Sequence, residues 1–142
     1  MTLASFSLSG PVAADDTGTL VLKTASGDYA YTVELATTDG TRAKGLMFRR
    51  ALPKSQGMLF LYDQPQDIGM WMRNTYIPLD MIFIDADRRV HRIETHTEPF
   101  SMKIIPSGGP VAAVLELNAG QADEIGLKPG DEVVYPDLDG AP

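Results

Sequence analysis

The chain has 142 residues and no cysteine, with 44% hydrophobic and 22% charged residues and a formal net charge of −7. These values predict one globular domain with a substantial core. They exclude a disulfide framework, a thiolate nucleophile and a cysteine-bound metal centre. The acidic charge disfavours a protein that follows nucleic-acid phosphates, and no apolar run reaches the roughly 18–20 residues that span a bilayer.

Residues 1–14 carry no charged side chain and end in small residues before Asp15 and Asp16. Small residues there resemble the end of a signal-peptide cleavage region, although the cationic start is missing. We expect residues 1–17 to be a signal-peptide remnant or a disordered tail, residues 18–136 to be a single domain, and residues 137–142 to be a disordered tail. A signal remnant predicts a periplasmic or otherwise exported protein, and a plain tail predicts a cytoplasmic one.

The first half of the chain alternates between strand patterns and one helix pattern. Residues 19–24 and 29–36 predict a hairpin that turns at residues 26–28. Thr or Asp in the run from Thr37 to Gly40 caps a helix expected over residues 39–48, with Ala43, Leu46 and Met47 on its buried face. Short strands are expected to follow at residues 58–62, 68–72 and 79–84.

The second half contains a predicted hairpin partner at residues 88–97, an irregular segment at 98–110, a strand at 111–117, a short helix at 118–125 and a last strand at 132–135. About eight short strands and two short helices, without a βαβ rhythm, predict an α+β domain. Its sheet is expected to be predominantly antiparallel, compact and barrel-like.

Basic residues gather in residues 42–54, which contain five cations and no acid. This segment is either a solvated surface or a local cationic site for a carboxylate or phosphate. On the predicted helix, Arg42 and Arg49 lie seven residues apart and therefore on one edge. They either clamp an anion bidentately or pair with structural carboxylates.

Polar residues precede the most apolar strand. The only tryptophan, Trp71, is followed by Asn74 and Thr75, and then by a turn at Pro78. Trp71 is either a core aromatic or a stacking platform for a flat ligand.

Two carboxylates, Asp80 and Glu116, stand in apolar runs, where burial raises a carboxyl pKa unless cations or N–H groups compensate. Each is either a structural partner of the arginines or a group that orients a ligand. The candidate ligand-binding residues are therefore Arg42, Arg49, Trp71, Asn74, Thr75, Asp80 and Glu116.

Catalytic signatures are missing from the sequence. His91 and His96 are five residues apart on an expected strand, which does not match a helical zinc motif. No lysine-serine pair or helix follows Gly108-Gly109, and no serine has a recognisable general base nearby. We therefore predict no catalytic residue, no metal ligand and no cofactor.

Several short motifs occur in a characteristic order along the chain. They are Gly45-Leu-Met-Phe-Arg49, Gly57-Met-Leu-Phe60, Trp71-Met-Arg-Asn-Thr75, Ile77-Pro-Leu-Asp80, Ile82-Phe-Ile84 and Val114-Leu-Glu-Leu117, with Gly120 and Gly130-Asp131 after them. Over residues 31–135 the chain resembles the DUF192 (UPF0127) family of small bacterial and archaeal proteins of uncharacterised function. The resemblance implies a compact β-rich fold, and many members carry an export signal or lipoprotein leader. A Pro-Cys pair that is frequent in the family is missing here, so no role of that cysteine carries over.

Three functions remain open at this point. The preferred hypothesis is a non-enzymatic binding or accessory domain, which holds a small polar or anionic ligand or a partner segment near Arg42, Trp71 and Asp80. The alternative is a hydrolase or carbohydrate-active enzyme that uses Asp80 with Glu116. A transcription regulator is a third hypothesis, and it requires a basic recognition helix.

Overall fold

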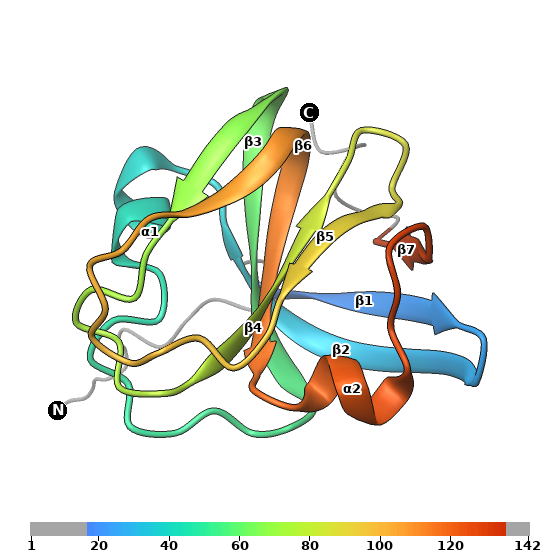
Figure 1. Cartoon of the computed structure of the whole chain (residues 1–142), viewed down its shortest axis with the longest axis horizontal. Coiled ribbons are helices and arrows are strands. Elements are labelled where there is room, and N and C mark those ends of the chain that lie inside the picture. Colours follow the sequence, from blue (N-terminus) through green and yellow to red (C-terminus); the bar gives the residue numbers. More distant parts are fainter. Residues whose placement is uncertain (1–16, 136–142) are drawn as a thin grey trace, which may run out of the picture.

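The computed structural model describes residues 17–135. The tails expected at residues 1–17 and 137–142 lie outside the described residues, except for Thr17, which begins the first strand. In the described part of the chain, seven strands form one sheet in the order β5-β4-β6-β3-β2-β1-β7, accompanied by two short helices (Figure 1). The elements are β1 (Thr17–Thr24), β2 (Gly27–Ala36), α1 (Asp39–Lys44), β3 (Gln56–Met70), β4 (Leu79–Ile84), β5 (Val90–Glu94), β6 (Ile105–Asn118), α2 (Gln121–Ile125) and β7 (Glu132–Val134).

The sheet is a half-barrel in which neighbouring strands are antiparallel except for β2 and β3. Its two edge strands approach each other at one end. There the amide of Val90 donates to Asp131 O at 2.9 Å, and the amide of Val133 donates to Arg88 O at 2.9 Å. The predicted α+β class and the predominantly antiparallel sheet are confirmed. The prediction of about eight strands in a compact barrel is corrected, because the described residues form seven strands in a half-barrel.

The strand count falls because β3 joins two predicted strands. The expected loop at residues 63–67 is a bulge in one long strand: Leu61 pairs with Ala113, and the next pair joins Gln66 to Val111. Pro65 lies in this unpaired stretch, where its missing N–H costs no ladder bond. The partner strand β6 likewise begins inside the segment that was expected to be irregular.

The helix predicted over residues 39–48 is shorter in the structure. A reciprocal capping box between Thr38 and Thr41 starts α1 where the sequence predicted it. The helix ends at Lys44 because Gly45 takes a φ of 50° and turns the chain away. Ala43 is exposed and only Leu46, beyond the helix, is buried. Arg42 and Arg49 therefore do not share a helical edge.

Apolar side chains pack on both faces of the sheet, in two clusters. One cluster contains Leu59, Ile82 and Leu115 and is closed by Ala122 and Ile125 of α2. The other contains Phe60, Met81 and Phe83 and is covered by Leu46, Leu52, Met72 and Ile77 from irregular segments. Residues adjacent on one strand thus serve different clusters, as the alternation of a pleated strand requires.

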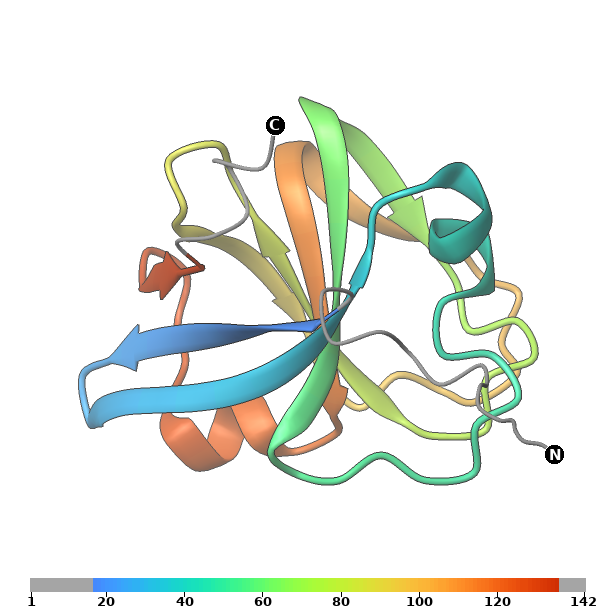
Figure 2. The ribbon, with the colours of Figure 1, turned by 180° about the vertical axis from the view of Figure 1, so that it is seen from behind.

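A long connection joins the parallel strands β2 and β3. Parallel neighbours cannot be linked by a tight turn, so residues 37–55 cross over the sheet and carry α1 with them. Figures 1 and 2 show this crossover next to the loops that follow β3 and β5, at one end of the molecule and opposite the β1–β2 hairpin tip.

Candidate functional site

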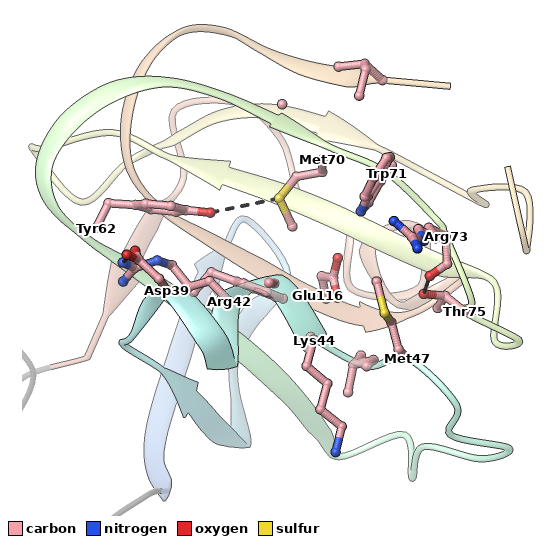
Figure 3. A pocket seen from close by; sticks show the side chains of 16 residues that line it. Asp39, Arg42, Lys44, Met47, Tyr62, Met70, Trp71, Arg73, Thr75 and Glu116 are labelled. Atoms are coloured by element: carbon pink, nitrogen blue, oxygen red, sulfur yellow. Dashed lines mark hydrogen bonds and ion pairs between the residues drawn. The ribbon is translucent and has the colours of Figure 1, made fainter. Parts of the chain in front are cut away.

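A cavity of about 460 Å³ lies between the crossover, β3 and β6. Its walls mix cations, aromatic rings and methionines (Figure 3). The residues used below are Arg42, Lys44 and Met47 of the crossover, Tyr62 and Met70 of β3, Trp71, Arg73 and Thr75 after β3, and Glu116 of β6.

Glu116 forms the floor of this pocket. Its neighbours across the sheet are Met58 on β3 and Met81 on β4, and both are buried. The residue is only 4% exposed, and within residues 17–135 its carboxyl group has no hydrogen-bond or ion-pair partner. Burial without compensation raises the pKa of Glu116 to about 8. Its carboxyl group is therefore mostly protonated at neutral pH and can both donate and accept a hydrogen bond.

Arg42 and Tyr62 form one wall. The guanidinium of Arg42 lies 5.1 Å from the centroid of the Tyr62 ring, donates to Leu61 O at 2.6 Å and to Asp39 Oδ1 at 2.9 Å. Burial raises the pKa of Tyr62, and the charge of Glu116 acts in the same direction. The hydroxyl of Tyr62 contacts Met70 Sδ at 4.0 Å (Figure 3). These contacts hold the aromatic face and the cation in place.

Trp71 and Arg73 form the opposite wall. Trp71 is 37% exposed, so its interpretation as a core aromatic is wrong. The Arg73 guanidinium lies 5.4 Å from the Trp71 ring centroid. Thr75 is buried below them and donates from Oγ1 to Arg73 O at 2.9 Å. Trp71 thus presents an aromatic surface to the pocket and to solvent.

Three of the predicted binding residues lie outside the pocket. Arg49 holds Glu34 with two hydrogen bonds of 2.5 and 2.7 Å, and this contact lowers the pKa of Glu34. Asn74, at a φ of 53°, accepts the amide of Phe48 and places its own side-chain amide 4.0 Å from Met47 Sδ. Both residues therefore support the segments that form the pocket.

Asp80, the third of these residues, is fully buried and accepts three backbone N–H groups. They come from His96 at 3.0 Å, Gly120 at 3.1 Å and Ala122 at 2.9 Å. These bonds tie β4 to the end of β5 and to the start of α2. Asp80 is thus a structural residue, because its carboxylate already accepts most of the hydrogen bonds that it can.

The two carboxylates that the hydrolase hypothesis paired point to opposite faces of the sheet. Asp80 is directly opposite Leu117, and Glu116 is directly opposite Met81. Directly opposed residues share a face and successive residues alternate, so Asp80 and Glu116 cannot act on one substrate. The proposed Asp80–Glu116 catalytic pair is wrong.

The sequence missed Tyr62, Met70, Lys44 and Arg73 as pocket residues. Tyr62 and Met70 border the β3 bulge, which is not visible in the alternation pattern. Trp71, Thr75, Arg42 and Glu116, in contrast, were predicted and do come together. The signal that found Glu116 was a lone carboxylate in an apolar strand.

The fold and the site define a class of protein: a half-barrel domain in which a pocket lies between the crossover and the sheet. The chain belongs to the DUF192 family, described as an uncharacterized ACR, whose model matches residues 21–135.

Two crystal structures are similar over nearly the whole domain. One is a protein of Sinorhizobium meliloti 1021, described as a candidate transcription regulator, with 43% identity, a TM-score of 0.84, and coverage of 89% of this chain and 98% of that one. The other is a protein of unknown function from Novosphingobium aromaticivorans DSM 12444, with 38% identity, a TM-score of 0.82, and coverage of 89% and 100%. No curated protein matches the chain. None of the described helices is long and apolar enough to cross a membrane.

Proposed function

We propose that this domain binds a small organic anion with an apolar body in the pocket over Glu116. The observation that carries the proposal is Glu116 itself: a residue 4% exposed, at the floor of a cavity, whose carboxyl group has no partner in residues 17–135. A buried polar group without a partner costs stability, and such groups are retained where a ligand completes them.

The charges around the pocket favour an anion. Three cations, Arg42, Lys44 and Arg73, line the walls, and the acid that lines the pocket besides Glu116 is Asp39, which is already bonded to Arg42. A protonated Glu116 adds a donor at the floor, where an ionised one would repel the ligand. The body of the ligand would lie between Tyr62, Trp71, Met47 and Met70, whose surfaces suit an aromatic ring or a short aliphatic chain.

Binding of this kind depends on pH in a defined direction. The charged and titratable groups that face Glu116 across the pocket are Asp39, Arg42 and Lys44 of the crossover, Tyr62 of β3, and Arg73. As the pH rises through about 8, Glu116 loses its proton and the donor becomes a repelling charge. Affinity for an anion should then fall by up to about tenfold per pH unit.

Calorimetric titration with benzoate and octanoate, from about pH 6 to about pH 9, tests this expectation. Benzamide is the neutral control for benzoate. We expect benzoate or octanoate to bind and benzamide to bind more weakly. The Glu116→Gln variant, whose amide still donates, should bind the anion with a flat pH profile. Glu132→Gln, the same change at an exposed position of β7 outside the pocket, should keep the wild-type profile.

Three results would contradict the proposal. The first is equal binding of benzoate and benzamide, because the pocket would then not select charge. The second is a Glu116→Gln profile that still falls with pH, because another group would then control affinity. The third is that neither benzoate nor octanoate binds at any pH, because both belong to the class of ligand that we propose.

Our proposal is binding without catalysis, in a protein exported from the cytoplasm. The uncharged residues 1–14 support export, and fractionation of the native host tests it. A role on DNA is less favoured, because α1, which carries Arg42 and Lys44, has only six residues. Salt-sensitive retention of duplex DNA by the purified chain would revive that role.

A further inference from the structure

Large apolar side chains are exposed around the mouth of the pocket. Five of them are between 37% and 59% exposed: Phe48, Trp71, Phe100, Met102 and Ile104. Two of these five, Trp71 and Ile104, also line the pocket. Scattered single apolar residues are normal on a surface, whereas a gathered group marks an interaction site.

Contacts between three segments show that this group is one surface. We call it the loop face and define it as residues 45–55, 71–78 and 99–104. The amide of Phe48 donates to Asn74 O at 2.8 Å, and the amide of Phe100 donates to Thr75 O at 3.1 Å. The rings of Tyr76 and Phe100 lie 5.0 Å apart. The first part of residues 45–55 and the other two segments lie side by side at one end of the molecule in Figures 1 and 2, and the rest of residues 45–55 leads from there toward α2.

Two of the exposed aromatic rings stand on strained backbone. Phe48 has a φ of 67° and Phe100 a φ of 68°. This left-handed region is unfavourable for bulky residues, and asparagine or glycine occupies it at much lower cost. Phenylalanine at both positions therefore lowers stability while it exposes apolar surface, which is typical of a binding surface.

The loop face is basic although the whole chain is acidic. It contains Arg49, Arg50, Lys54, Arg73 and Lys103 and no aspartate or glutamate, in a chain of net charge −7. Arg49 and Lys54 form ion pairs with Glu34 and Glu124. Arg50 and Arg73 instead lie over the rings of Tyr76 and Trp71, at 5.2 and 5.4 Å. Cations are thus interleaved with the exposed aromatic residues.

We propose that the loop face docks on an anionic lipid bilayer and presents the mouth of the pocket to it. Aromatic, methionine and isoleucine side chains can enter the interface between headgroups and acyl chains, while arginine and lysine contact anionic headgroups. The charge complementarity favours an anionic surface. This inference goes beyond the proposed function and does not depend on which ligand the pocket holds.

Vesicle binding by the full chain tests the inference. The vesicles contain phosphatidylcholine alone or phosphatidylcholine mixed with phosphatidylglycerol. We expect sedimentation with the anionic vesicles only, weakened by high salt. Since Trp71 is the only tryptophan, its emission should shift to the blue on binding, because the ring leaves water.

Matched variants separate this surface from general charge attraction. Lys103→Glu on the loop face should weaken binding at least about fivefold, because each basic residue at the surface contributes appreciably. Lys128→Glu makes the same change between α2 and β7, away from the loop face, and should have little effect. The double variant Phe48→Asn and Phe100→Asn should lower affinity on the order of tenfold. Its melting temperature should hold or rise, because asparagine tolerates positive φ.

Other occupants of the loop face would give different results. Equal effects of the two lysine variants, or no binding to anionic vesicles, would overturn the proposal. Dimerisation lost in the phenylalanine double variant would assign the face to a second copy of this chain. Blue-shifted Trp71 emission that vesicles do not change would assign it to a segment of this chain outside the described residues. Benzoate binding is a separate assay, so either proposal can fail without the other.

Discussion

At the scale of single residues, the two buried carboxylates Asp80 and Glu116 have opposite surroundings. The Asp80 carboxylate receives three backbone N–H groups, while the Glu116 carboxyl group receives no hydrogen bond from the described residues. Both looked alike in the sequence, as single acids in apolar runs. The difference arises because Asp80 on β4 is opposite Leu117, the residue after Glu116 on β6, so the two acids point to opposite faces of the sheet.

Glu116 should make the free energy of unfolding fall as the pH rises. In the unfolded chain it ionises near 4.5, and in the folded domain near 8. Between these values the native state holds more protons than the unfolded state, so stability decreases with increasing pH. In Glu116→Gln this pH-dependent loss is absent. The free energy of unfolding of the variant should therefore exceed that of wild type by on the order of a few kcal/mol at about pH 8. Urea unfolding at several pH values measures the gain, and parallel pH profiles would contradict it.

Replacement of Asp80, in contrast, should lower the free energy of unfolding. Asp80→Ala leaves three amides without their acceptor, and we expect a loss of at least about 3 kcal/mol in the free energy of unfolding. Asp80→Asn keeps one accepting oxygen but turns an NH₂ group toward donors, so its loss should be smaller but clear. Thermal unfolding followed by circular dichroism measures both variants. An Asp80→Ala variant with unchanged stability would show that these hydrogen bonds do not hold α2 to β4.

At the scale of elements, the contact between β3 and β6 fixes the floor of the pocket. A Cβ atom at Gly57 would lie 2.5 Å from Glu116 O and 2.6 Å from Leu117 Cδ2. Gly57→Ala must therefore push β6 away and should cost roughly 2 kcal/mol. A Cβ atom at Gly40, inside α1, would lie in open space with no contact within 4 Å. Gly40→Ala should therefore raise the free energy of unfolding by up to about 1 kcal/mol. Denaturant titration of both variants tests the contrast, and equal effects would contradict it.

The sequence predicted elements well where one local pattern dominates. The apolar run 79–84 is β4 in the structure, and the capping residues Thr38 and Thr41 mark the true start of α1. The prediction from the sequence failed where pairing between distant strands overrides a local signal. Pro65 indicated a loop, but the bulge lets β3 continue beside β6. The hydrophobic period after Lys44 indicated more helix, but Gly45 and Phe48 at positive φ end it.

At the scale of the whole molecule, the site could be predicted only in part. Arg42, Trp71, Thr75 and Glu116 were visible as unusual residues, and they meet in one pocket. The pairing of Arg49 with Glu34 depends on how the crossover returns to β2, which no local pattern contains. The same holds for the loop face, whose three segments are far apart in the sequence and meet only in the folded chain.

The parallel pairing of β2 with β3 has a consequence for how such a domain can diversify. Because β2 and β3 run in the same direction, their connection must cross the sheet, and residues 37–55 supply one wall of the pocket. Insertions or exchanges in this connection can reshape the wall while every strand keeps its register. Domains of this architecture could therefore acquire new ligands by grafting one segment, and chimeras that exchange the crossover between relatives are a practical route to new specificities.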